Sequence, residues 1–284
     1  IVDTIYGDWY GFLFQDHDGL GRVPSILAVN WDYVDTKNNK YYPDWPMMGY
    51  YDDKGNFVNC LGTSQKVKNP LTIQLNKSDK ENYIVGDDDF SYPDFKEGDS
   101  LKKVWQWNHN PDDANWSVTE NPGYYRIKNG KVAGNIWFAR NSLTQRTVGP
   151  NFTSETCVLT ENMKPGDYAG LAAISAHYGM VGVKCDENGN RYVFQGCNSD
   201  TNSGAKAKKE DRIKENAVSE EKIEGNAPVY LKIEYAFNTG KTRADRANFF
   251  YSLDGENWKS IGKTFSLGFD TATTFMGTRS WLVN

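Results

Sequence analysis

The 284-residue sequence lacks any apolar run close to the roughly 20 residues that a membrane-spanning helix requires. It contains only four cysteines, and their spacing matches no metal-ligand pattern. Basic residues are scattered along the chain, and the formal net charge is -5. These absences argue against a membrane partner, a structural zinc site and a nucleic-acid partner.

The sequence also lacks a nucleotide-binding loop and a Ser-His-Asp signature, so we expect no organic cofactor. It begins at Ile1 without an initiator Met or a signal-peptide pattern, and it stops at Asn284 inside an apolar, strand-like segment. We therefore expect a fragment of a longer protein. Cys185 and Cys197 flank a turn at residues 188–190 and could face each other across a hairpin. A disulfide and reduced thiols both remain open there.

Aromatic and turn-forming residues are abundant, with 9 Trp, 17 Tyr, 14 Phe and 26 Gly. Leu is sparse, and such a composition favours strands and turns over helices. Turn signals such as Asp254-Gly255 recur between short segments, which is typical of an antiparallel sandwich or barrel. Residues 230–237 alternate, and the side chains predicted to face the core are Leu231, Ile233, Tyr235 and Phe237. The sequence therefore predicts an all-β protein.

Three parts follow one another along the chain. Residues 1–60 contain several short strand-like segments, and residues 61–86 form a Lys-, Asn- and Ser-rich connector with little periodicity. Residues 87–284 form a second unit with regular turns. Within it, residues 199–226 are dense in Lys and Glu, and we expect a mobile solvated loop or short surface helix there.

One segment combines tryptophans with hydrogen-bonding side chains. Trp105, Trp107 and Trp116 lie within twelve residues, beside Asn108 and His109. Flat aromatic rings stack on the C–H bonds of a sugar, and polar groups pair with its hydroxyls. The same tryptophans could instead be core residues of a β-protein. On a strand, Trp105 and Trp107 share one face, and both readings of that face stay open.

A second polar segment covers residues 139–146. As a strand, it would present Arg140, Ser142, Thr144 and Arg146 on one face. Such a face could line a glycan groove or be an ordinary solvated surface.

Charged residues cluster at two further places. A Gly-rich turn at residues 16–22 carries His17 and Arg22; the guanidinium could hold a sugar hydroxyl or a carboxylate by its planar fork. His17 could bond a sugar hydroxyl, bind a cation, or be structural. Asp88 and Asp89 could hold calcium or form an ordinary polar loop.

Long segments of the chain resemble glycoside hydrolase family 43. Residues 7–24 and 45–49 resemble the end of that family's catalytic five-bladed propeller. The resemblance extends to the family's C-terminal domain, a concanavalin-like (laminin-G-like) jelly roll, at residues 105–112, 139–146, 166–171 and 251–258. The resemblance implies a partial propeller end at residues 1–60, followed by an antiparallel β-sandwich at residues 87–284.

Members of this family cleave β-xylosides and α-arabinosides with inversion, which needs two carboxyls about 6.5–9.5 Å apart. In the family the base Asp, the acid Glu and a pKa-modulating Asp come from earlier blades, so the resemblance implies that this chain lacks them and is inactive alone. Arg22 matches the arginine that supports the family's active site; His17 matches less surely. The implied partners are xylan, xylo-oligosaccharides and arabinoxylan. The full-length protein would be secreted, periplasmic or at the cell surface.

Two alternatives remain beside the xylan-degrading hydrolase. The sandwich could be a non-catalytic carbohydrate-binding module that uses Trp107, Asn108, His109, Arg140 and Arg146. It could also be a structural module that braces the propeller. Relatives continue past the region that matches residues 275–281 into a further strand; without that strand, a core position would be empty and a sheet edge open.

Overall fold

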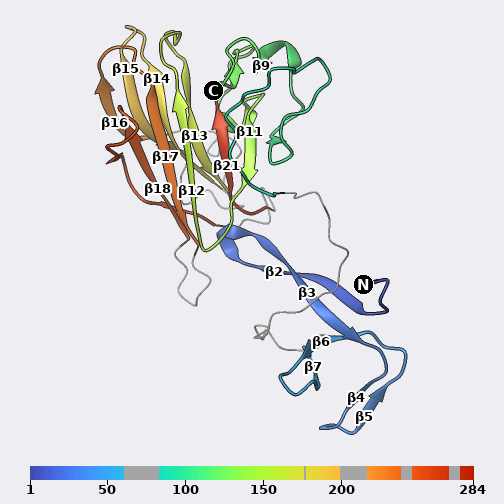
Figure 1. Cartoon of the computed structure of the whole chain (residues 1–284). Helices are drawn as coiled ribbons and strands as arrows, with labels where there is room; N and C mark the ends of the chain where they lie inside the picture. Colours follow the sequence, from blue (N-terminus) through green and yellow to red (C-terminus); the bar gives the residue numbers. More distant parts are fainter. Residues whose placement is uncertain (61–82, 176, 199–215, 238–244, 269–275) are drawn as a thin grey trace. The chain divides into compact units, whose positions relative to one another are not determined.

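The computed structural model describes residues 1–60, 83–175, 177–198, 216–237, 245–268 and 276–284. The chain forms two compact units, residues 1–16 with 22–81, and residues 17–21 with 82–284. In the described residues the helices are three short 3-10 turns: η1 (Asp18–Leu20), η2 (Asp113–Asn115) and η3 (Ile136–Phe138). None of the described helices has the length and apolar character to cross a membrane. The remaining regular structure is strand, which confirms the all-β prediction (Figure 1).

The first unit is built on a five-stranded antiparallel sheet in the order β1-β2-β3-β6-β7, beside a hairpin of β4 and β5. Their bounds are β1 (Val2–Asp3), β2 (Trp9–Asp16), β3 (Arg22–Asn30), β4 (Tyr33–Asp35), β5 (Lys40–Tyr42), β6 (Met47–Tyr51) and β7 (Phe57–Asn59). Gly49 lets β6 and β7 pair closely, because a Cβ at this position would lie 2.1 Å from the Val58 carbonyl oxygen.

The second unit contains a seven-stranded sheet in the order β16-β15-β14-β13-β21-β11-β8. Its strands are β8 (Gln106–Trp107), β11 (Leu143–Arg146), β13 (Tyr168–Ile174), β14 (Tyr178–Cys185), β15 (Arg191–Cys197), β16 (Asn216–Ile223) and β21 (Arg279–Val283). Every recorded pairing in this sheet is antiparallel.

A second sheet stacks on the first, with the order β12-β17-β18-β19 and β20 paired to β18 (Figure 1). The strands are β12 (Asn151–Val158), β17 (Val229–Ala236), β18 (Arg246–Ser252), β19 (Lys259–Ser260) and β20 (Phe265–Ser266). A small ribbon joins β9 (Trp116–Ser117) to β10 (Arg126–Ile127). Two packed antiparallel sheets confirm the predicted β-sandwich.

The main core lies between these two sheets. The residues predicted to point inward along β17 and just after it are all in this core, with exposed fractions of 0% for Leu231, 0% for Ile233, 2% for Tyr235 and 4% for Phe237. A second apolar cluster covers the outer face of the large sheet and includes Tyr178, Met180 and Trp281. The alternation of apolar and polar residues along the sequence therefore predicted correctly which face of β17 is buried.

One sequence prediction within the second unit is wrong. The solvated segment predicted at residues 199–226 contains β16, which pairs with β15; residues 199–215 lie outside the described residues. Few apolar side chains suffice for β16, because β15 supplies its backbone partners, Ile223 is buried and Glu221 accepts a hydrogen bond from the Tyr251 hydroxyl. Of the two alternatives left open for Cys185 and Cys197, the structure has reduced thiols: Cys185 lies opposite Arg191, whereas Cys197 lies opposite Gly179 at the other end of the strand pair.

Candidate functional site

Arg22 opens β3 and faces the end of β2. Its Nε lies 3.2 Å from Asp16 Oδ1, and its guanidinium carbon lies 4.5 Å from the centroid of the Phe14 ring. The side chain keeps about a third of its surface exposed (35%). An arginine that stacks on a ring and pairs with a carboxylate is pre-oriented. The supporting role of Arg22 in an active site stays a prediction.

The turn between β2 and β3, residues 17–21, belongs to the second unit. The Gly19 N–H donates to Asp245 Oδ2 at 2.8 Å, and the Gly19 carbonyl accepts from the backbone N–H and the hydroxyl of Thr278 at 2.7 and 2.6 Å. Gly21, at φ +81°, and Gly277 touch so closely that a Cβ on Gly21 would lie 2.5 Å from Gly277 Cα. Asp245, Gly277 and Thr278 thus form a socket around Gly19. The sequence analysis did not predict this socket, because Gly19 and Asp245 are 226 residues apart, and the glycines of the turn were its only local signal.

His17 is half-buried within this turn. Its backbone N–H donates to the Gly21 carbonyl, and its own carbonyl accepts from Leu20 N. These bonds give the His17 backbone a structural role in closing the turn. A sugar-binding or cation-binding role for its imidazole stays a prediction.

Trp107 packs among aromatic rings of the chain. Its ring centroid lies 5.1 Å from that of Trp116 and 6.4 Å from that of Tyr125. In β8 it lies directly opposite the buried Leu143 and therefore points to the same side as the core. Trp105 precedes the strand and does not share a strand face with Trp107, because its indole N–H turns to Asp88 Oδ2 at 2.8 Å.

Asp88 is surrounded by hydrogen-bond donors. Its side chain has an exposed fraction of 0%; Oδ2 accepts from the Tyr92 hydroxyl and Trp105, and Oδ1 accepts from Phe90 N and lies 3.1 Å from Lys102 Nζ. Burial raises the pKa of Asp88, but these hydrogen bonds outweigh it and lower the pKa overall. Both carboxylate oxygens thus already have donors.

Among the described residues, the Asp89 carboxylate accepts a hydrogen bond only from the nearby Ser91 N–H. Across the described ranges, no group of three or more His, Cys, Asp or Glu side chains is placed to hold a metal ion. The chemistry around Asp88 fits a structural carboxylate, and calcium at Asp88 and Asp89 stays a prediction.

Asn108 and His109 both turn toward one backbone oxygen. Asn108 Nδ2 donates to the Trp137 carbonyl at 3.3 Å, and His109 Nε2 lies 2.6 Å from the same oxygen. These contacts hold the segment after β8 against η3. Both side chains therefore already contact a backbone oxygen of the chain.

The sequence predicted that residues 140–146 form one continuous strand with a polar face, and this prediction is wrong. Asn141 has φ +60°, so the extended strand begins only at Leu143. Ser142 and Thr144 are buried, and their hydroxyls donate to the carbonyls of Ala139 and Gln106. Only Arg140 and Arg146 of the four predicted residues are exposed.

Two of the predicted glycan-binding residues, Trp107 and Arg146, lie on opposite faces of the sheet. Trp107 points to the side of Leu143, whereas Arg146 alternates to the opposite side of β11 together with Thr144. Arg146 instead lies directly opposite Arg279 of β21, a residue that the sequence patterns did not single out.

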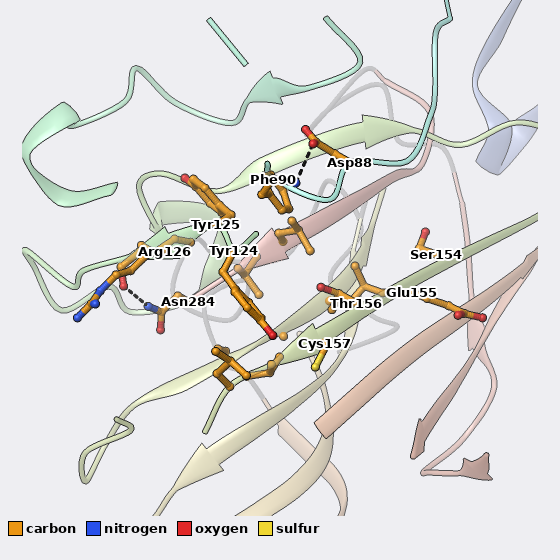
Figure 2. A pocket seen from close by; sticks show the side chains of 18 of the residues that line it. Asp88, Phe90, Tyr124, Tyr125, Arg126, Ser154, Glu155, Thr156, Cys157 and Asn284 are labelled. Atoms are coloured by element: carbon orange, nitrogen blue, oxygen red, sulfur yellow. Dashed lines mark hydrogen bonds between the residues drawn. The ribbon is translucent and has the colours of Figure 1, made fainter. Parts of the chain in front are cut away.

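A groove of about 1180 Å³ opens in the second unit between β12, the end of β21 and the segments around Phe90 and Tyr124 (Figure 2). Ser154 and Thr156 of β12 line it on the side that faces the core, and both are only half-buried. Among the described strands, β12 pairs only with β17. The edge of β12 that faces the groove thus has no strand partner among the described residues, and the further strand stays a prediction.

Comparisons with known proteins place the second unit in one family. Residues 93–282 match the family model described as "Beta xylosidase C-terminal Concanavalin A-like domain". A β-xylosidase of Formosa agariphila is 27% identical over 300 residues, which cover 96% of this chain and 42% of that protein. A relative from Xylanibacter ruminicola is 27% identical over 268 residues, covering 94% of this chain and 41% of its own length. The chain thus spans about two fifths of these curated relatives.

Solved structures give the same fold over nearly the whole chain. A bifunctional GH43-CE protein of Bacteroides eggerthii is 33% identical with a TM-score of 0.73, covering 99% of this chain and 30% of that one. A GH43 glycoside hydrolase engineered for both endo-xylanase and exo-arabinofuranosidase activity is 22% identical with a TM-score of 0.74, covering 99% and 49%. At that lower identity the likeness concerns the fold alone.

Proposed function

Because the chain belongs to glycoside hydrolase family 43, through its β-xylosidase-type C-terminal concanavalin A-like domain, we propose that it is part of a xylan-degrading enzyme. The proposed reaction is inverting, exo-acting hydrolysis of β-xylosides or α-arabinofuranosides. The name of the Formosa agariphila relative supports the xyloside. The activity belongs to the proposed whole protein, because the chain covers about two fifths of its relatives.

We further propose that this chain lacks the catalytic acid and base. An inverting glycosidase needs a general acid whose pKa is raised, so that it carries a proton near neutral pH. The described carboxyl groups with a shifted pKa are all shifted downward: Asp35, Asp52, Asp88, Glu120, Asp186 and Asp254. None of these six groups has the property that a general acid requires. The proposal is carried by the coverage, because the chain spans only about two fifths of its curated relatives.

The test is an activity assay of the purified chain with p-nitrophenyl β-xyloside and p-nitrophenyl α-arabinofuranoside. We expect no turnover, because general acid–base assistance is worth about 10²–10⁴-fold for each group and both are proposed to be missing. The full-length enzyme is the positive control. Turnover by the chain that survives repurification would contradict the proposed absence, and an inactive full-length protein would contradict the proposed reaction.

A second candidate function is a structural one, in which the sandwich holds the Gly-rich turn at residues 17–21. The socket that Asp245, Gly277 and Thr278 form around Gly19 favours it. Arg22 directly follows this turn in the chain, so a held turn restrains the backbone next to the proposed active-site arginine.

Replacement of Gly277 tests this structural role. A Cβ at Gly277 would lie 2.1 Å from the Leu20 carbonyl oxygen, so Gly277→Ala should destabilise the protein by about 1–3 kcal/mol and speed amide exchange at residues 19–21. Gly268→Ala is the matched control, because nothing lies within 4 Å of its added Cβ. Equal stability and equal amide-exchange rates in the two variants would contradict the structural role.

A further inference from the structure

Two arginines lie directly opposite each other on the outer face of the large sheet. Arg146 of β11 pairs in register with Arg279 of β21. Like charges at directly opposed positions repel each other. Among the described residues, neither guanidinium forms an ion pair with a carboxylate. The pair therefore costs stability unless something else compensates for it.

Arg279 is held in a defined orientation. Its Nε donates to Thr144 Oγ1 at 2.9 Å and its Nη2 to the Thr144 carbonyl at 3.5 Å. Thr144 is itself buried, with its hydroxyl bonded to the Gln106 carbonyl at 3.0 Å. Burial, and then the charge of Arg146, lower the pKa of Arg279 to about 10, which reflects an uncompensated cation. The guanidinium is thus fixed by one edge, and no hydrogen bond is formed by Nη1 within the described residues.

The same face carries further donors that lack acceptors. Trp281 lies two residues along β21 from Arg279 and opposite Thr144, so it shares their face. Its buried indole N–H has no hydrogen-bond partner among the described residues, and the same holds for Trp137, which packs against the same cluster. A buried donor without an acceptor is costly. Two cations and two indole N–H groups therefore gather on one face, and none of them has a carboxylate partner among the described residues.

We propose that Arg146 and Arg279 bind the carboxylate of a uronic acid unit on an oligosaccharide. A planar carboxylate matches the guanidinium fork and would offset the repulsion within the pair. The choice of a sugar acid rests on the proposed function in xylan degradation. The site is separate from the groove beside β12, since neither arginine lines that groove.

The experiment measures binding to the full chain by calorimetry at low salt. The ligands are a xylo-oligosaccharide with one glucuronic acid side unit and a neutral one of the same backbone length. We expect the acidic ligand to bind at least about tenfold more tightly, because a hydrogen bond to a charged group contributes enough for a tenfold change. Added salt should weaken it.

Variants separate this site from a general charge effect. Arg279→Met should bring the acidic ligand down to the affinity of the neutral one, and Arg146→Met should weaken it several-fold while the chain stays folded, since Arg146 is exposed. Lys222→Met is the matched control: it removes an exposed cation from β16, the opposite edge strand of the same sheet, and should leave binding unchanged.

Three results would overturn the assignment: equal affinity for both oligosaccharides, equal weakening by Lys222→Met, or free glucuronate binding as tightly as the acidic oligosaccharide. The last result would indicate a site for small carboxylates. None of them bears on the proposed hydrolase, which is tested separately by turnover of the full-length enzyme.

Discussion

Asn108 and His109 illustrate how residues suited to a sugar can serve the fold. Both side chains turn toward the Trp137 carbonyl, and Asp88 is engaged in the same way by Tyr92 and Trp105. A buried polar group without a partner costs more than a hydrogen bond returns, and the Asp88 side chain, with an exposed fraction of 0%, is accordingly satisfied within the chain. Residue type near tryptophan is therefore weak evidence for a glycan site until the partners are known.

Trp107 gives a prediction at this scale. Trp107→Ala should lower the free energy of unfolding by about 3 kcal/mol, near the low end for loss of a large ring, because the ring is packed but half-buried. Denaturant unfolding measures it. Phe138→Ala is the control, since that ring is 53% exposed. A stable Trp107→Ala chain that binds xylohexaose less well would reverse the assignment and make Trp107 a sugar platform.

Four of the described hairpin turns are built in the same way at the scale of the element. In each, an aspartate accepts backbone N–H groups from the turn and the side-chain amide of an asparagine that follows. The aspartates are Asp35, Asp52, Asp186 and Asp254, and the asparagines are Asn38, Asn56, Asn190 and Asn257. The sequence predicted the turns at residues 188–190 and at Asp254-Gly255, because turn-forming residues are neighbours in the chain.

These turns predict how stability depends on pH. Hydrogen bonds from the asparagine side chains and the backbone lower the pKa of Asp186 and Asp254. A lowered folded-state pKa contributes stability above the unfolded value of about 3.9, and this contribution is lost as pH falls below it. We expect melting temperatures at pH 7, 5 and 3 to fall less in an Asp186→Asn, Asp254→Asn double variant than in the parent.

Glu224→Gln, which changes an exposed carboxyl just after β16, is the control for this series and should follow the parent. Identical pH curves for the parent and the double variant would show that the turns do not set the acid sensitivity.

The open edge of β12 matters at the scale of the whole molecule. Exposed edge strands invite pairing with other chains, and the groove beside β12 leaves its inward residues half-exposed. We expect the isolated chain to self-associate with rising concentration, as measured by light scattering after gel filtration. Thr156→Lys should reduce association, because a charge on the inward side opposes pairing.

Thr153→Lys is the matched control, since Thr153 is exposed and points to the opposite side of the same strand. A chain that stays monomeric at all concentrations, or equal effects of both lysines, would contradict association through this edge.

The sequence by itself determined the strand character, the buried face of β17, the turns at residues 188–190 and at Asp254-Gly255, and the family. Each depends on neighbours a few residues apart or on the order of long segments: Leu231 and Ile233 lie inward because side chains alternate along any strand. The same reasoning failed at residues 140–142, where the left-handed backbone of Asn141 breaks the alternation, and at β16, where pairing with β15 outweighs a polar composition.

Only the tertiary structure decided which distant residues meet. The contact of Gly19 with Asp245 joins positions 226 residues apart, and the pairing of Arg146 with Arg279 depends on the register between β11 and β21. A one-residue change of register would turn either arginine to the other face of the sheet. Local patterns carry no information about such pairings, because the final packing of strands determines which side chains become partners.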